Sequence, residues 1–298
     1  MAVFGTSDAQ VLMPRNIADG MVTDARTGSV VAALSGREPM RFGEMDIITF
    51  NDFPKAEFVE EGADKASTTG GFDNVTAVPH KAQVTMRFNE EVQWADEDYQ
   101  LGVLSTLGSA GSLALARALD LGLIYRINPL TGSVISGWTN YLDATTKRVD
   151  MTDEADIDVE DAVGLLLNDS KRVNGIAFDP SYGWTLATAR YADGRKKFPD
   201  LGFGTNISNF EGLNASTSDT VSGQPESTDT GVRAIVGDFQ NRIRWGVQRQ
   251  IPVELIRFGD PDGQGDLKRK NQIALRLEIV YGWYVWADYF AVIEDTAS

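Results

Sequence analysis

The sequence predicts an α+β protein, with helices and strands in separate stretches of the chain. Residues 81–88 and 271–281 alternate apolar and polar side chains, which is the period of a strand with one buried face. Residues 96–129 instead space their apolar side chains three and four apart, as an amphipathic helix does. Because 42% of the 298 residues are apolar, the chain can bury a substantial core.

The chain before the long helix predicts an arm and a hairpin. The first 20 residues include Pro14 and show no sustained period, which indicates an extended arm. The hairpin tip contains Gly62, Gly70 and Gly71 and few apolar side chains, so it cannot build a core of its own. The expected elements are an extended arm at 1–20, a short helix at 24–36, a strand at 39–52, and two strand-like hairpin arms at 53–59 and 81–88.

The longest expected helix lies within residues 96–129. Asp96, Glu97 and Asp98 place negative charge at its start, as the helix dipole favours, and Pro129 ends the pattern. A helix of about 28 residues would be about 40 Å long. Its glycines recur at the same spacing as its apolar residues, so we expect a spine helix that packs closely against a sheet.

The second half of the chain predicts shorter elements. Residues 214–231 are dense in Gly, Ser and Thr, which is typical of an exposed loop. At the end of the chain, we expect a strand at 271–281 that backs the spine helix, a turn at Gly282, and a second apolar piece that locks the C-terminus into the domain of the spine helix. The other expected elements are helices at 152–169 and 181–194 and strands at 173–180, 232–239 and 242–258.

Composition excludes several classes of site. There is no cysteine, so disulfides and thiolate chemistry are excluded, and the single histidine, His80, excludes a multi-histidine metal site. We therefore expect no metal and no cofactor. Charged residues interrupt the apolar C-terminal stretch, and the N-terminus lacks the features of a secretion signal, so we expect no membrane segment.

The charge is large and uneven. The formal net charge of −16 argues against a protein that grips nucleic acid over its whole surface. Residues 143–169 carry nine acidic and two basic side chains, whereas residues 233–276 carry nine basic and five acidic ones. Such segments are usually solvated faces, but they could also be opposite patches that meet between copies of the chain.

No motif singles out a catalytic centre. The stretch from Asp260 to Asp266 superficially resembles a calcium loop, but Asn271 stands where an EF-hand needs its last carboxylate. A glycine-rich strand connection is the better interpretation, and His80 is expected to be a surface or hairpin residue. Because many Asp and Glu pairs exist, a soluble hydrolase that uses two carboxylates stays open as an alternative.

Several stretches together resemble a known family. They are "NGIAFDPSYGWTLATARYADGRKKFPD", "IVGDFQNRIRWGVQRQIPVELI" and "NQIALRLEIVYGWYVWADYFAVIE". Together with the order of arm, hairpin, spine helix, α/β region and closing strand, they resemble the major capsid proteins of tailed bacteriophages, which have the Hong Kong 97-type fold. The resemblance covers essentially the whole chain in element order, although each motif is diffuse.

This resemblance implies a division of the chain. The hairpin would be an extended loop that reaches across a neighbouring subunit, and the axial domain would surround the centre of pentamers and hexamers. The implied parts are an N-terminal arm at 1–25, a peripheral domain with the spine helix at 26–49, 87–145 and 263–298, the extended loop at 50–86, and the axial domain at 146–262.

The resemblance also implies a structural function without catalysis. Copies would assemble in the host bacterial cytoplasm into an icosahedral phage head, which encloses double-stranded DNA without sequence-specific binding. Scaffolding, portal and decoration proteins would be the other partners, and the protein would end in the virion capsid. An encapsulin-like bacterial compartment shell has the same fold and is the alternative within it.

Some members of this family form a covalent cross-link between subunits. A hairpin lysine attacks a neighbour's asparagine, and a glutamate assists by accepting a proton. By resemblance, the matching residues here are Lys65, Asn271 and Glu278. Family members without a cross-link also carry Asn and Glu in the closing strand, so the residues alone do not decide the matter.

Overall fold

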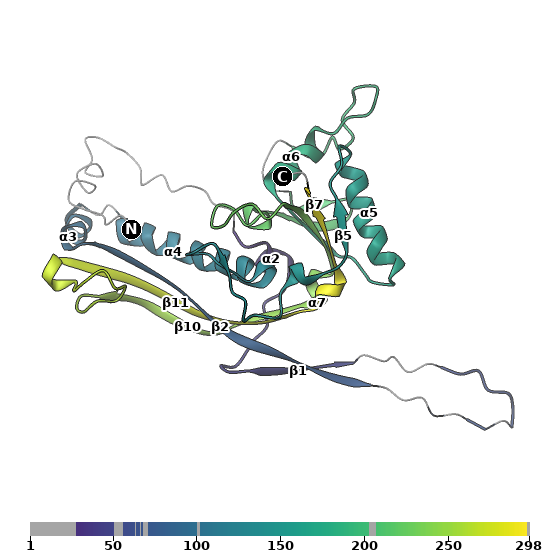
Figure 1. Ribbon diagram of the computed structural model, residues 1–298, viewed down its shortest axis with the longest axis horizontal. Coiled ribbons are helices and arrows are strands. Elements are labelled where there is room, and N and C mark those ends of the chain that lie inside the picture. Colours follow the sequence, from purple (N-terminus) through teal and green to yellow (C-terminus); the bar gives the residue numbers. More distant parts are fainter. Residues whose placement is uncertain are drawn as a thin grey trace.

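The computed structural model describes residues 28–50, 56–62, 64, 65, 67, 71–99, 102–202 and 207–296. Two main sheets lie side by side, and a long hairpin projects from the body at the lower right of Figure 1. Helices and sheets are mixed, which confirms the expected α+β class. The arm expected at 1–25 lies outside the described residues.

The first sheet has four antiparallel strands in the order β1-β2-β11-β10. The central strand β2 changes partners along its length, since residues 72–77 pair with β1 and residues 78–89 pair with β11. The strand expected at 53–59 falls partly outside the described residues, and its described part, 56–59, is not a strand. The four strands are β1 (Met45–Phe50), β2 (Phe72–Asn89), β10 (Ile243–Ile256) and β11 (Gln272–Val285).

The spine helix is shorter than expected and is preceded by a separate helix. Gly102 has a left-handed backbone (φ 69°), and Asp96 accepts hydrogen bonds from the first amides of the second helix, at Val103 (2.9 Å) and Leu104 (3.3 Å). Negative charge therefore stabilises the start of the second helix, as expected. The charge comes from Asp96, which lies in the preceding helix and not in the second helix itself. The elements are α3 (Glu90–Tyr99), α4 (Val103–Asp120) and a π-helical turn, η1 (Leu121–Tyr125).

Helix α4 covers one face of β2 and β11 (Figure 1). Gly111 lets the helix approach the sheet, because a Cβ there would lie 2.9 Å from Leu277. By length and composition alone Val103–Tyr125 could span a membrane, but 56% of that window is buried inside the protein. The core beneath α3 and α4 consists of Phe88, Val92, Val103, Leu107, Leu115, Ile273, Leu275 and Leu277.

The opposite face of this sheet is crossed by residues 37–43. Gly246 and Gly282 are paired on neighbouring strands, and the crossing segment lies directly on them. A Cβ on Gly246 would overlap the carbonyl oxygen of Glu38, and one on Gly282 would lie 3.0 Å from the sulfur of Met40. The turn expected at Gly282 is therefore wrong, because β11 continues through this glycine to make room for the crossing segment.

The second sheet has six strands in the order β5-β12-β9-β6-β8-β7, and both of its faces are buried. Helices α5 and α6 cover one face, and the other face shares its core with the first sheet. The helices expected at 152–169 and 181–194 are confirmed, with shorter bounds. The elements are β5 (Arg148–Asp150), α5 (Ala155–Asn168), β6 (Gly175–Phe178), α6 (Pro180–Thr188), β7 (Asn209–Phe210), β8 (Leu213–Thr217), β9 (Val232–Gly237) and β12 (Phe290–Glu294).

Each sheet combines strands from distant parts of the chain. Strand β10 pairs with β11 in the first sheet, whereas β12 pairs with β5 and β9 in the second. The last apolar piece, β12, therefore belongs to the second sheet, although Phe290 and Val292 share a core with Trp283 and Val285 of β11. The remaining short elements are α2 (Val30–Leu34), β3 (Ile127–Asn128), β4 (Ser133–Val134), η2 (Leu142–Ala144), η3 (Asp219–Val221), α7 (Phe239–Arg242), η4 (Lys268–Lys270) and η5 (Ala287–Tyr289).

Candidate functional site

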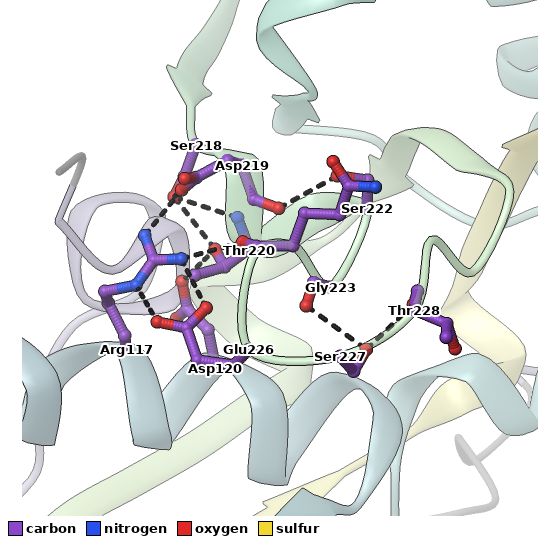
Figure 2. Close-up of polar contacts among 11 residues, drawn as sticks. Arg117, Asp120, Ser218, Asp219, Thr220, Ser222, Gly223, Glu226, Ser227 and Thr228 are labelled. Atoms are coloured by element: carbon purple, nitrogen blue, oxygen red, sulfur yellow. Dashed lines mark hydrogen bonds and ion pairs between the residues drawn. The ribbon is translucent and has the colours of Figure 1, made fainter. Parts of the chain in front are cut away.

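The polar loop that joins β8 to β9, residues 218–230, wraps around the end of α4 (Figure 2). The expectation that residues 214–231 form an exposed loop holds only in part, because residues 224, 225 and 228–230 are exposed whereas Ser218 and Thr220 are fully buried. The side-chain hydroxyl oxygens of Thr220 and Ser218 lie 2.9 Å apart, within hydrogen-bonding distance. The loop can be buried because its polar groups find partners inside the protein.

Arg117, on α4, holds the far end of this loop. Its side chain is 1% exposed, and its guanidinium donates to both carboxylate oxygens of Glu226, over 2.7 and 2.6 Å. It also donates to the carbonyl of Gln224 over 2.8 Å and to the carboxylate of Asp219. Burial alone lowers the pKa of Arg117, but the hydrogen bonds and charges of Glu226 and Asp219 outweigh it, so the pKa is raised. The guanidinium is therefore permanently charged and enclosed by its partners.

Asp120 lies almost one helical turn further along α4 and is fully buried. Its carboxylate accepts hydrogen bonds from the backbone amides of Val30 (2.8 Å) and Val31 (3.2 Å), the hydroxyl of Thr220 (2.7 Å) and the hydroxyl of Ser29. Burial raises the pKa of Asp120 to about 6, although these hydrogen bonds oppose the rise. One carboxylate thus joins the start of α2 and the loop to the spine helix.

We call Arg117, Asp120 and residues 218–230 the α4 clamp. It connects the helix that covers the first sheet with a loop of the second sheet. Neither charged side chain reaches solvent, and both are held by partners inside the protein. We missed both residues in the sequence, although they are the only charged ones among the 23 residues of Val103–Tyr125, which is the signal that could have revealed them.

The structure does not bring Lys65, Asn271 and Glu278 together. Lys65 is exposed on the projecting hairpin, whereas the β10–β11 end of the first sheet lies at the opposite side of the molecule (Figure 1). Asn271 and Glu278 are seven residues apart along β11, which is about 23 Å at the rise of a strand. A reaction that uses all three residues would have to draw them from different subunits.

Asn271 and Glu278 also have partners within the chain. The amide of Asn271 donates to Glu91 over 2.7 Å. The carboxylate of Glu278 pairs with the ammonium of Lys81 at 2.9 Å. Within one chain, the side chains of both residues are therefore already engaged.

The loop at 260–266 holds an arginine side chain. Arg87 is 2% exposed and donates to the carboxylates of Asp260 (3.2 Å) and Asp262 and to the carbonyl of Gly265 (3.0 Å). Its guanidinium therefore lies where a calcium loop would hold its ion. In the part of the chain that the structure describes, no group of three His, Cys, Asp or Glu residues could hold a metal.

His80 lies on the core-facing side of β2, close to the point where that strand changes partners. Its ring contacts the rings of Trp138 and Trp283 in tilted arrangements, with 4.0 Å between ring centroids in each pair. Burial lowers the pKa of His80 to about 4. His80 therefore lies in a strand of the hairpin, which is one of the two positions expected for it, and the two tryptophans leave its side chain only partly exposed.

A His80→Phe variant should lose less stability in acid than the wild type. In the wild type, His80 contributes stability that is present above its unfolded pKa of 6.5 and is lost as the pH falls towards about 4. We expect a loss of about 1–2 kcal/mol between about pH 7 and pH 4.5, after allowance for partial exposure. Denaturant unfolding at the two pH values measures this difference.

The phenylalanine variant provides the required comparison. The phenyl ring would keep the contacts with Trp138 and Trp283 but could not titrate. Asp120 titrates in the same range with the opposite sign, because its pKa is raised and its contribution is lost as the pH rises through about 6. Equal acid sensitivity in the variant and the wild type would show that His80 does not carry the effect.

The comparisons with known proteins agree with this fold. The profile of the "Phage capsid family" matches residues 9–292. A solved structure from Mycobacterium phage Ogopogo is 45% identical, covers 99% of this chain and 100% of its own, and superposes with a TM-score of 0.84. One from Gordonia phage Cozz is 30% identical, with coverages of 99% and 94% and a TM-score of 0.83.

More distant structures share the fold alone. The capsid of an empty GTA particle is 14% identical, covers 98% of each chain and has a TM-score of 0.64. No curated protein sequence matches the chain. The matches over nearly the whole length confirm the resemblance to phage capsid proteins, and the chain therefore belongs to the phage capsid family as a structural protein of the bacteriophage capsid.

Proposed function

We propose that this chain is the major shell protein of an icosahedral phage head, assembled from pentamers and hexamers around double-stranded DNA. The projecting hairpin is the observation that carries the proposal. Phe58 is fully exposed there and Phe72 is 75% exposed, although aromatic side chains normally stabilise a fold by burial. A surface of this kind is favourable when another copy covers it.

Charge supports a second copy as the partner of the hairpin. Glu57, Glu60 and Glu61 surround Phe58 at the tip. At the far end of the first sheet, Phe258 is 69% exposed and follows β10, and the exposed basic turn Lys268–Lys270 precedes β11. These two surfaces are complementary in charge and both offer an aromatic side chain, but they lie at opposite ends of one chain (Figure 1). Contact between them would require two subunits.

The family resemblance suggests which part of the chain would form each domain of the shell protein. The hairpin at 50–86 would be the extended loop, the rest of the first sheet with α3 and α4 would be the peripheral domain, and the second sheet with α5 and α6 would be the axial domain. The arm would lie along another neighbour. Under this assignment β10 would belong to the peripheral domain and β12 to the axial domain, in line with their sheet partners.

The proposal extends to partners that would share the particle. The net charge of −16 suits a shell that must not hold packaged DNA tightly. Assembly in the host bacterial cytoplasm, and scaffolding, portal and decoration proteins, follow from the phage assignment. An encapsulin-like shell would enclose proteins instead, and no observation favours the carboxylate hydrolase.

Electron microscopy of the purified protein tests this function. We expect the wild type to form uniform closed shells and the Glu60→Lys/Glu61→Lys variant to form at least tenfold fewer at equal concentration, since like charges would face the basic turn. An Asp200→Lys/Glu211→Lys variant makes the same change in net charge at exposed positions elsewhere and should assemble normally. A wild type that stays monomeric would contradict the proposal.

We expect no covalent cross-link between subunits. In one chain Asn271 and Glu278 already have partners, Glu91 and Lys81, and a cross-link would have to break both contacts. Shells boiled in denaturant should therefore give a single band at the chain mass of 32.5 kDa. A ladder of higher bands that disappears in a Lys65→Arg variant would show that the cross-link forms.

A further inference from the structure

The outer face of α5 combines carboxylates with exposed apolar side chains. Ile157 is 42% exposed and Leu165 is 40% exposed, and both lie on the side of the helix that faces away from the second sheet. Glu160 and Asp161 are exposed between them, at the spacing of neighbouring turns. Among the residues that the structure describes, neither carboxylate has an ion-pair partner. We call these four residues the α5 outer face.

A small hairpin after α6 offers the complementary surface. Arg190 and Lys196 form a β-bridge, and the amide of Tyr191 donates to the carbonyl of Arg195 over 2.9 Å, so residues 190–197 are ordered. The hairpin contains four basic residues and one acidic residue. The side chain of Arg195 is 80% exposed, and Tyr191 is 53% exposed. We call residues 190–197 the basic hairpin.

The two surfaces do not meet within one chain. Lys197 pairs with Asp156 at 2.7 Å, which holds the base of the basic hairpin at the first turn of α5. Asp161 lies about 8 Å further along the helix axis than Asp156, and Leu165 about 14 Å further. Arg195 is turned towards Asp193 in its own hairpin, at 2.6 Å.

We infer that the basic hairpin of one subunit binds the α5 outer face of the next subunit. Arg190 and Arg195 would face Glu160 and Asp161, and Tyr191 would cover the exposed apolar side chains. A contact between two different surfaces of identical chains is heterologous and closes into a ring when the rotation fits. This inference rests on the proposed shell function and assigns one contact within its pentamers and hexamers.

Charge reversal and rescue test this contact. The Glu160→Lys/Asp161→Lys variant should need at least tenfold more protein for half-maximal assembly in sedimentation experiments, and the Arg190→Glu/Arg195→Glu variant should show a similar defect. The variant that combines all four substitutions should return to within about threefold of the wild type, since opposite charges face each other again. The Asp200→Lys/Glu211→Lys variant is the control for net charge.

The outcomes separate this inference from the proposed function. If the wild type forms no rings or shells, the proposed function fails. If the wild type assembles and the Glu160→Lys/Asp161→Lys variant assembles equally well, only the inferred contact is overturned. The contact is also overturned if both double variants are folded and defective but their combination is not restored, and circular dichroism establishes that each variant is folded.

Discussion

A Gly246→Ala variant is expected to lose about 3 kcal/mol of unfolding free energy, more than most overpacked sites lose. The added Cβ would overlap the backbone oxygen of Glu38 and lie 2.8 Å from Cγ of Met40. Met40 can rotate, but Glu38 is held by the bond from its amide to the carbonyl of Trp245, at 2.9 Å. The crossing segment would have to lift from the sheet. Thermal unfolding should show a Tm lower by roughly 6 °C.

The same substitution at Gly164 is the matched control. Gly164 lies inside α5, and a Cβ there would meet no atom within 4 Å. Because alanine favours a helix over glycine, Gly164→Ala should stabilise the protein by about 0.5–1 kcal/mol. If both alanine variants changed the stability in the same direction, the close crossing at Gly246 would not be the cause.

An Arg117→Ala variant is expected to lose about 3–5 kcal/mol, the cost of breaking a buried ion pair by removing one partner. The substitution leaves the carboxylates of Glu226 and Asp219 without their cation and the carbonyl of Gln224 without its donor. It also removes a large side chain from the core. Denaturant unfolding of the purified chain at neutral pH measures the loss.

Two further variants test whether the loss of stability comes from the buried contacts of Arg117 or from the loss of any arginine. Arg195→Ala removes an exposed arginine and should cost less than about 0.5 kcal/mol. In a double-mutant cycle, Arg117→Ala and Glu226→Gln together should cost about 1–3 kcal/mol less than the sum of the two single changes. Additive losses would show that the Arg117–Glu226 pair does not stabilise the loop.

The clamp and the crossing segment describe how the two sheets are joined. The clamp fixes the end of α4 to a loop of the second sheet, and Asp120 also holds the start of α2. The chain then leaves α2 and crosses the first sheet over Gly246 and Gly282. In the proposed shell, subunit contacts would act on the hairpin and on α5, while these joints would keep the body of each subunit rigid.

Local patterns predicted much of the fold. The period of two in residues 81–88 and 271–281 identified β2 and β11, and the stretches at 152–169 and 181–194 identified α5 and α6. A helix or strand forms where the apolar side chains fall on one face, and the spacing of residues close together in the sequence determines this. The family resemblance also came from the sequence, because the order of elements is a property of the chain.

What the sequence determined by itself was the α+β class, the helices α4, α5 and α6, the strands β1, β2, β6, β9, β10 and β11, and the resemblance to the capsid family. Tertiary structure alone decided the burial of Ser218 and Thr220, the passage of β11 through Gly282, and the pairing of β12 with β9. Each of these depends on a partner far away in the chain. Thr220 can be buried because Asp120 accepts its hydrogen bond across 100 residues of sequence, and no local pattern records that contact.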